Sequence, residues 1–183
     1  MDIQYEVRIP RDRIAVLIGI KGQIKRKIEQ DTSTRLNIDS QEGDVAILGK
    51  DALDVNVSKD IVRAIGRGFN PEFAFELLKP DYFFESIDIS EVSSKKNASI
   101  NRIKSRLIGK EGGARRTIEK LTNTHICVYG KTISIIGYVS NVDAARKAVT
   151  SLIRGAPHSS VYATLERTMK NNRVLETNIE DAE

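Results

Sequence analysis

The stretch RLIGKEGGARRTIEKLTNTHICV, residues 106–128, repeats an earlier stretch, VLIGIKGQIKRKIEQDTSTRLNI, residues 16–38. At a constant offset of ninety positions the two share Leu-Ile-Gly, a second glycine three residues later, an Ile-Glu pair and two threonines. Further along, VAILG at 45–49 resembles ISIIG at 133–137, after a connection that is two residues shorter. Self-similarity with kept spacing indicates copies of one structural unit. The sequence therefore predicts two copies of one small domain.

Length and composition agree with this division and exclude several classes of protein. At roughly 150 residues per domain, 183 residues fit one large domain or two small ones, so the repeat decides for two. A hydrophobic content of 40% excludes a disordered chain. No apolar run reaches the ~20 residues of a membrane span, and MDIQYEVRIP at the N-terminus lacks the features of an export signal. We expect a cytoplasmic protein with no membrane contact.

Metal, disulfide and catalytic chemistry are not expected. Cys127 is the single cysteine, which fits a reducing cytosol, and His125 and His158 are far apart in sequence. The chain has no Walker loop, no zinc-ligand spacing and no histidine near a candidate nucleophile. We therefore predict no cofactor, no metal, no catalytic residue and no enzymatic activity.

Each copy has a readable order of elements. In the first, the alternating YEVRI predicts a strand, two helices flank a glycine loop, and LNI and VAIL form a hairpin. A long helix follows, with apolar residues at intervals of four: Leu53, Val57, Ile61 and Ile65. The second copy repeats this β-α-α-β-β-α order from FESIDI onward. Pro71 after Asn70 predicts the first position of a connecting helix.

The predicted fold class is α+β, with a three-stranded antiparallel sheet in each copy and helices packed on one face. Residues 1–80 form the first domain with its connecting helix, and residues 81–170 form the second with its C-terminal helix. Residues 171–183 are acidic and predicted to be disordered.

Charge is segregated along the chain, although the net value is only +4. From Lys95 to Lys131, ten basic residues face two acidic ones, giving +8; from Arg11 to Glu29, six face two, giving +4. Residues 72–91 have one base against six acids, giving −5. Charge runs of this kind are usually solvated faces. The two basic stretches, however, bracket the two glycine loops.

The loops have a chemistry that suits phosphate. Glycine lets a backbone approach a phosphate without a Cβ in the way, and a helix that starts at the loop directs its N-terminal amides and dipole at an anion. Lys21 and Lys110 add attraction that depends on salt. The alternative is a tight turn between helices with no ligand.

An Ile-Gly-x-x-Gly loop between two helices, followed by a hairpin and a helix, resembles the type I KH domain. The resemblance covers nearly the whole chain, twice, and implies that about four single-stranded nucleotides lie on an apolar groove beside each loop. In this sequence Ile20 stands where a basic residue is common, and Glu111 repels phosphate unless it points away. The aliphatics of the groove strands are open to an ordinary core role. The implied RNA-binding residues are Gly109, Lys110, Glu111, Gly112, Arg115, Arg116, Arg102, Lys104, Arg106, Ile108, Ile126 and Val128, with Gly19, Ile20, Lys21, Gly22, Lys25 and Arg26 in the first copy.

Three longer segments narrow the resemblance: RGFNPEFAFELLKPDYFFESIDI (67–89), residues 106–137 and LIRGAPHSSVYATLER (152–167). They are similar to the archaeal branch of the two-KH ribosome assembly factors, the Dim or partner-of-Nob class, which is related to the Krr-type proteins. That resemblance implies binding to the 3′-end region of small-subunit rRNA during pre-rRNA processing, by a monomer. It also implies three partners: the rRNA dimethyltransferase, the 3′-end endonuclease and the alpha subunit of translation initiation factor two.

A protein-interaction scaffold with one degenerate KH copy is the competing hypothesis, and the acidic tail suits it. All five phenylalanines lie between residues 69 and 84, within the acidic segment. Aromatic rings can stack on bases, but phosphate is repelled there. We predict instead a hydrophobic seam that joins the two domains.

Overall fold

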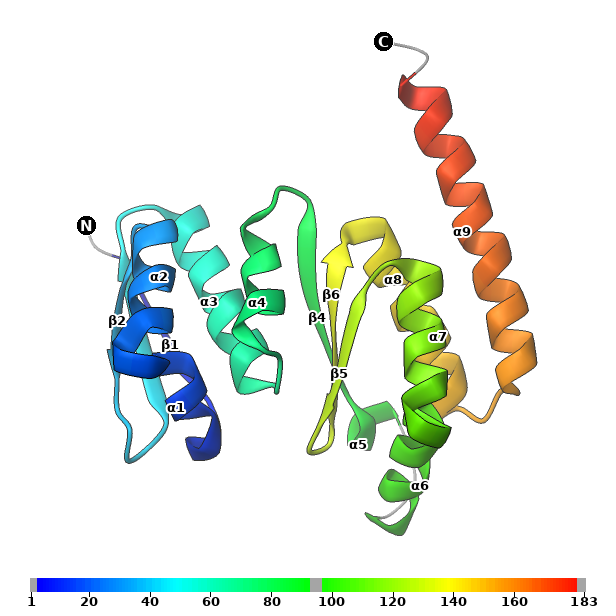
Figure 1. The fold of residues 1–183 in the computed structure, drawn as a ribbon, viewed down its shortest axis with the longest axis horizontal. Coiled ribbons are helices and arrows are strands. Elements are labelled where there is room, and N and C mark those ends of the chain that lie inside the picture. The colour runs from blue at the N-terminus through cyan, green and yellow to red at the C-terminus, as the bar shows by residue number, and fades with distance from the viewer. Residues whose placement is uncertain (1–2, 93–96, 181–183) are drawn as a thin grey trace. The chain divides into compact units, whose positions relative to one another are not determined.

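The computed structural model describes residues 3–92 and 97–180, so Lys95 and Lys96 of the basic stretch lie outside the described residues. The chain divides into two compact units, Met1–Phe84 and Glu85–Glu183. The division thus falls slightly later than the predicted one between residues 80 and 81. Each unit contains one three-stranded sheet, and in the first unit α1, α2 and α3 lie on one side of it (Figure 1).

The first unit has the predicted order of elements. These are β1 (Ile3–Arg8), α1 (Arg11–Ile18), the 3-10 turn η1 (Ile20–Gly22), α2 (Gln23–Asp31), β2 (Arg35–Ile38), β3 (Asp44–Gly49) and α3 (Ala52–Gly66). The connection contains α4 (Pro71–Ala74) and the 3-10 turn η2 (Phe75–Leu78), with Asn70 as N-cap and Pro71 at the first helical position, as predicted.

The second unit repeats the order, with the short helix α5 inserted after its first strand and α9 added after its last helix. Its elements are β4 (Tyr82–Asp88), α5 (Ile89–Val92), α6 (Asn97–Ile108), η3 (Lys110–Gly112), α7 (Gly113–Thr122), β5 (His125–Tyr129), β6 (Thr132–Tyr138), α8 (Val139–Ile153) and α9 (His158–Glu180). The division after Phe84 falls within β4, so its first residues, 82–84, count with the first unit. The α+β prediction with two like domains is confirmed.

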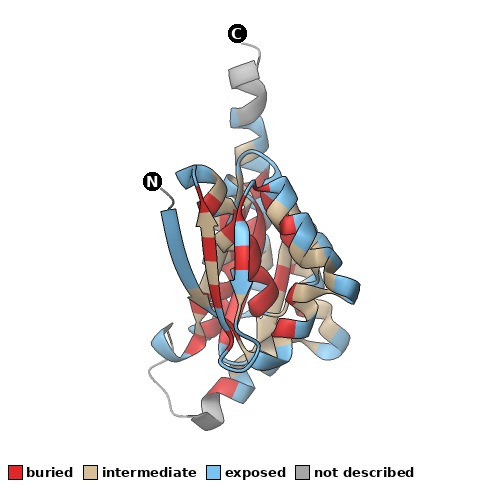
Figure 2. Cartoon of the chain, turned by 90° about the vertical axis from the view of Figure 1, so that its left-hand side faces the viewer, coloured by how far each residue is buried: buried red, intermediate tan, exposed pale blue. Residues whose placement is uncertain are grey.

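The two sheets have the same topology. The strand orders are β1-β3-β2 and β4-β6-β5, so the third strand of each copy is central. Tyr5 and Leu36 both lie opposite Ile47 in the first sheet, and Ile126 lies opposite Ile135 in the second. In β3 buried residues alternate with more exposed ones, which is the pattern of a sheet with one face on the core (Figure 2). Helices α1, α2 and α3 share the core of the first sheet through Leu17, Ile28 and Ile61.

Helix α3 forms as predicted, but its buried face differs. Leu53 is 77% exposed, whereas Val55, Ser58 and Ile65 are buried. A spacing of four residues rotates by about 40° per step on a helix of 3.6 residues per turn. Three steps back from Ile65 therefore bring Leu53 to the solvent. Its N-terminus is capped by Asp51, whose carboxylate accepts the N–H of Leu53 at 2.8 Å.

Helix α9 corrects the prediction of a disordered tail from residue 171. The helix continues to Glu180, and residues 181–183 lie outside the described part. Val161, Leu165 and Met169 of α9 belong to the apolar core of the second unit. No glycine or proline interrupts residues 158–180, so the packed first turns are followed by residues that can continue the helix.

The phenylalanine-rich segment makes cation–π contacts inside the first unit. The Lys27 Nζ lies 4.9 Å from the ring centroid of Phe75, and the Arg63 Cζ lies 5.3 Å from that of Phe84. Such contacts contribute about 0.5–1 kcal/mol at exposed sites. The seam between the domains stays a prediction. Across residues 3–92 and 97–180, no helix is long and apolar enough to cross a membrane.

Two leucines of α9 test its role in the core. Leu165 is 3% exposed and Leu175 is 62% exposed. Leu165→Ala leaves a cavity, and we expect it to lower the free energy of unfolding by about 2–5 kcal/mol. Leu175→Ala removes the same atoms from the surface and is expected to stay within about 0.5 kcal/mol of wild type. Urea unfolding of the full chain measures both; equal midpoints for the two variants contradict the assignment.

Candidate nucleic-acid interface

The two glycine loops have the same backbone conformation. Gly19 has φ 74° and ψ 177°, and Gly109 has φ 73° and ψ 179°. The second glycines, Gly22 and Gly112, both have φ 74° and left-handed geometry. The first loop is therefore formed as fully as the second, although its residue types differ.

The first glycine of each loop is required by space as well as by its positive φ. A Cβ at Gly109 would lie 2.7 Å from both the N and the Cβ of Ala114, and one at Gly19 would lie 2.4 Å from Cγ1 of Ile24. The chain can reverse between helices this closely only without a side chain at that position. At Gly112 the nearest atom is the Arg116 Nη1 at 3.4 Å, so φ is the main constraint there.

Each loop opens a helix whose N-terminus has no side-chain cap. Gly22 and Gly112 are the N-caps of α2 and α7, and neither can supply a capping oxygen from a side chain. The first N–H groups of a helix have no partner within the helix and favour an anion. The loop and the helix start together form a site suited to a phosphate.

Some of the basic residues predicted to bind RNA lie at the two glycine loops. Lys21 and Lys110 are exposed within the loops. The guanidinium groups of Arg26 and Arg116 lie next to Gly22 and Gly112, each with Nη1 3.4 Å from the Cβ position of the glycine. Glu111 is exposed and has φ 53°, the left-handed position that Lys21 has in the first loop. The two loops therefore have the same backbone conformation but carry different charges at the same positions.

Other basic residues predicted to bind RNA form ion pairs or hydrogen bonds within the protein. Lys25 Nζ lies 3.9 Å from Glu29 Oε1, and Arg115 Nε lies 3.7 Å from Glu119 Oε2. Arg106 donates to the carbonyls of Gly155 and Ala156, which anchors the connection between α8 and α9. Arg102 is exposed and Lys104 half-buried on α6, the helix that leads into the second loop.

The aliphatic residues of the predicted grooves divide into core and surface. Ile126 is only 5% exposed and belongs to the core cluster, so its side chain is not a base platform. Val128 and Ile108 are half-buried and remain accessible in part. Ile20 is 79% exposed at the tip of the first loop, where an apolar side chain has no partner to pack on.

In both copies, a glutamate of the helix after the loop is hydrogen-bonded to the next strand, β2 or β5, which we call the groove strand. The repeat in the sequence matched these two glutamates but did not explain them. Glu29 Oε1 accepts the backbone N–H of Leu36 at 2.8 Å, and Glu119 Oε1 accepts that of Ile126 at 2.7 Å. A threonine of the repeat also hydrogen-bonds to the backbone: Thr122 Oγ1 donates to the Ile118 carbonyl at 2.7 Å. Their recurrence at the same offset was the only signal of this role available in the sequence.

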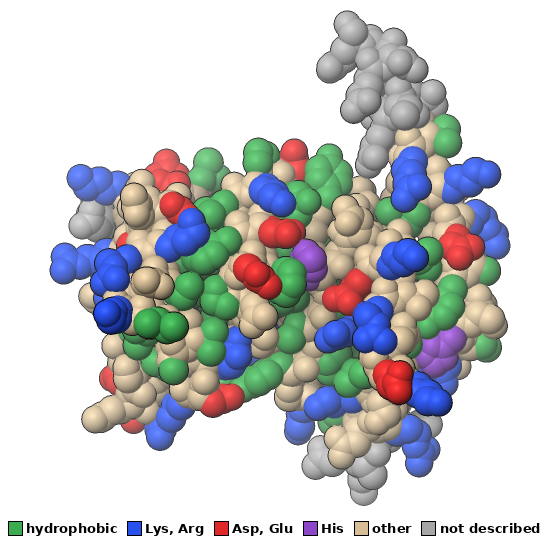
Figure 3. All heavy atoms as spheres, viewed as in Figure 1, with side chains coloured by type: hydrophobic (Ala, Val, Ile, Leu, Met, Phe, Trp, Pro, Cys, Tyr) green, Lys and Arg blue, Asp and Glu red, His purple; other side chains and the backbone are tan. Residues whose placement is uncertain are grey.

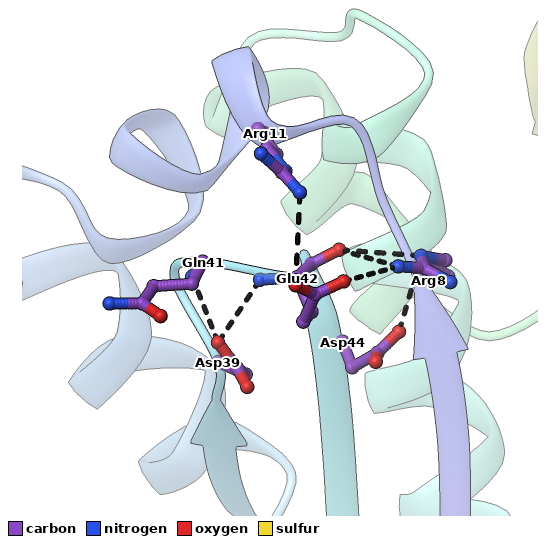
Figure 4. A network of polar contacts seen from close by, with 6 residues as sticks. All are labelled: Arg8, Arg11, Asp39, Gln41, Glu42 and Asp44. Carbon is purple, nitrogen blue, oxygen red and sulfur yellow. Dashed lines mark hydrogen bonds and ion pairs between the residues drawn. The ribbon is translucent and has the colours of Figure 1, made fainter.

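The turns that end the groove strands carry opposite charge. In the first unit Glu42 pairs with Arg8 at 3.0 Å and with Arg11 at 3.8 Å, and Asp44 lies 3.5 Å from Arg8 (Figure 4). Backbone N–H groups of Glu42 and Gln41 donate to Asp39 and lower the pKa of its carboxyl (Figure 4). In the second unit the shorter turn carries Lys131 instead. Phosphate is therefore favoured more beside the second turn.

No group of three or more His, Cys, Asp or Glu side chains within residues 3–92 and 97–180 is arranged to hold a metal ion. The phosphate-suited loops and the apolar residues beside them are the features that a ligand can use.

Comparison with known proteins agrees with this geometry. Residues 83–170 match the eukaryotic type KH domain (KH-domain type I), and residues 4–64 match the KH domain. A KH domain-containing protein of Methanocaldococcus jannaschii is 49% identical over 165 residues, which are 88% of this chain and 72% of that protein. RNA-binding protein pno1 of Dictyostelium discoideum is 31% identical over 176 residues, 93% of this chain and 73% of that protein.

A solved structure is also similar. A chain in the crystal structure of an a/eIF2alpha–aDim2p–rRNA complex from Pyrococcus horikoshii OT3 superposes with a TM-score of 0.87 and 43% identity, covering 93% of this chain and 96% of that one. Fold, loops and comparisons define a protein with two type I KH domains. More particularly, the chain belongs to the family of RNA-binding protein pno1 and archaeal Dim2p.

Two neighbouring glycines test the loop geometry. Gly109→Ala puts a Cβ against Ala114 at a φ of 73°, and we expect a loss of about 1–3 kcal/mol in the free energy of unfolding. Gly113 has φ −62° and open space around its Cβ position. Gly113→Ala is therefore expected to stabilise by about 0.4–1 kcal/mol. Thermal unfolding of the two variants compares them, and a similar loss in both is the opposing result.

The glutamate contact gives a second test. Glu119→Ala leaves the N–H of Ile126 without its partner, and we expect the free energy of unfolding to fall by about 1–3 kcal/mol. Glu166→Ala, on the exposed surface of α9, is the matched control and is expected to change it by less than about 0.5 kcal/mol. Faster amide exchange at Ile126 in the first variant reports the loss directly; unchanged exchange contradicts the role assigned to Glu119.

Proposed function

We propose that this protein binds single-stranded RNA at its glycine loops, and that the RNA is the 3′-end region of small-subunit rRNA during ribosome assembly and pre-rRNA processing. The observation that carries the proposal is the pair of loops with equal geometry, each opening an uncapped helix next to an arginine. Backbone amides and guanidinium groups hold the phosphates, while the bases lie toward the half-buried aliphatics of the groove.

The relatives support the choice of RNA. The Pyrococcus horikoshii structure is named as a complex of aDim2p with a/eIF2alpha and rRNA, and the Dictyostelium relative is named an RNA-binding protein. By that likeness we propose the alpha subunit of translation initiation factor two as a protein partner. The rRNA dimethyltransferase and the 3′-end endonuclease are proposed on the family resemblance. The protein would act as a cytoplasmic monomer without catalysis.

The second copy is proposed as the stronger RNA site. Its loop has Lys110 in place of Ile20 but Glu111 in place of Lys21, so the proposal depends on the turn, which has Lys131 where the first copy has Glu42 and Asp44. The adaptor hypothesis needs a degenerate loop, and the conformation of the first loop argues against one. An exposed Ile20 nevertheless favours a protein contact at the first loop as the second candidate function.

Fluorescence anisotropy with a labelled twelve-nucleotide RNA from the 3′ end of small-subunit rRNA tests the proposal across a salt series. We expect Lys110→Gln with Arg116→Gln to weaken binding about tenfold or more, and to lower the slope of log K against log salt by about 1.4, or roughly 0.7 per phosphate contact. Lys21→Gln with Arg26→Gln should have a smaller effect. These variants keep both glycines, so the fold is not disturbed.

The matched control combines Lys147→Gln on α8 with Arg154→Gln at its C-cap, and it removes the same charge far along the chain from either loop. It is expected to bind as wild type does. If all three double variants bind RNA with the wild-type affinity and slope, the loops are not the RNA site and the proposal fails.

A further inference from the structure

A group of basic side chains on α7 and α9 is not used by the site described above. We call Lys120, Arg167, Lys170 and Arg173 the α7–α9 basic face. All four are exposed, and α9 packs against α7 in the second unit. Figure 3 shows Lys and Arg side chains over both helices on the face turned to the viewer.

Between residues 158 and 170, the solvent side of α9 has little charge compensation. Val161, Leu165 and Met169 turn inward, and three bases recur at intervals of three on the exposed side. Like charges at this spacing repel each other by a few tenths of a kcal/mol per pair. Glu166 is the single acid among residues 158–175. A face of this kind favours an anionic ligand.

Three of the four cations, Lys120, Arg167 and Lys170, differ from others in the unit in having no ion pair within the described residues. Arg115, Arg146 and Lys147 are paired with Glu119 or Asp143. Binding a phosphate at Lys120, Arg167 or Lys170 does not require an existing salt bridge to break.

The basic face continues from the glycine loop. Helix α7 starts at Gly113, directly after the loop, and Arg116 and Lys120 follow on its exposed side at a spacing of one turn. At 1.5 Å per residue, Lys120 lies about 12 Å along the helix from Gly112. A strand held at the loop by about four nucleotides has its next phosphates within reach of this surface.

We propose that the α7–α9 basic face binds the phosphates of RNA nucleotides that flank those in the second KH groove. This rests on the proposed RNA binding and extends it, since the helix added to the KH unit then serves as a second, sequence-independent contact. Its contribution is to affinity and salt dependence, because phosphate contacts position a strand without reading its bases.

The test compares two lengths of RNA on the full chain. The variant is Arg167→Gln with Lys170→Gln and Arg173→Gln, and the probes are the labelled twelve-nucleotide rRNA 3′-end RNA and a tetranucleotide from within it. We expect binding of the longer RNA to weaken about tenfold, and its salt slope to fall by about 2, or roughly 0.7 for each of three phosphates. Tetranucleotide binding should be unchanged, as should binding of both RNAs to the Lys147→Gln, Arg154→Gln control.

Two other outcomes of this experiment contradict the proposal. Equal loss for both RNAs means that α9 acts on the groove itself, and it overturns the proposal. Unchanged binding of the longer RNA overturns it too, and a simultaneous loss of binding to purified initiation factor alpha subunit would assign the face to a protein. Failure of the proposed function is recognised separately, because the Lys110→Gln, Arg116→Gln variant would then bind both RNAs as wild type does.

Discussion

The close reversal of the chain at Gly19 and Gly109 is the constraint on which the rest of the structure depends. Each glycine has a φ near 74° and lies where a Cβ would be 2.4–2.7 Å from atoms of the next helix. This reversal ends one helix and starts another with its amide groups uncapped. The same geometry that permits the fold therefore leaves a place for an anion, so folding and binding share one requirement.

The glutamate contact carries this local geometry across to the sheet. Glu29 and Glu119 accept hydrogen bonds from the backbone of β2 and β5, while Lys25 and Arg115 form ion pairs with these glutamates. Each loop helix and its strand are thereby held at a fixed distance, which a groove for bases requires. Cations that the sequence suggested as phosphate ligands act here through a carboxylate. The charge at the loop is consequently smaller than a count of nearby bases indicates.

The two glycine loops share a backbone conformation and differ in charge. Lys21 and Glu111 occupy the same left-handed position, and the strand turns carry Glu42 and Asp44 in one copy and Lys131 in the other. Since the loops match in φ and ψ, a difference in phosphate binding between the two loops themselves comes from their side chains. Helix α9 adds a further difference, because it brings exposed cations beside α7 in the second copy.

The sequence by itself determined the number of domains, their element order and the positions of both loops, because a repeat with kept spacing and glycines at a reversal are local signals. The tertiary structure decided which of the predicted side chains are exposed at the loops and which are held by other contacts. Ile126 went to the core, Arg106 to the carbonyls before α9, and Leu53 to solvent. It also continued α9 through residues predicted to be disordered. These outcomes depend on packing between residues distant in the chain, which spacing within one segment does not encode.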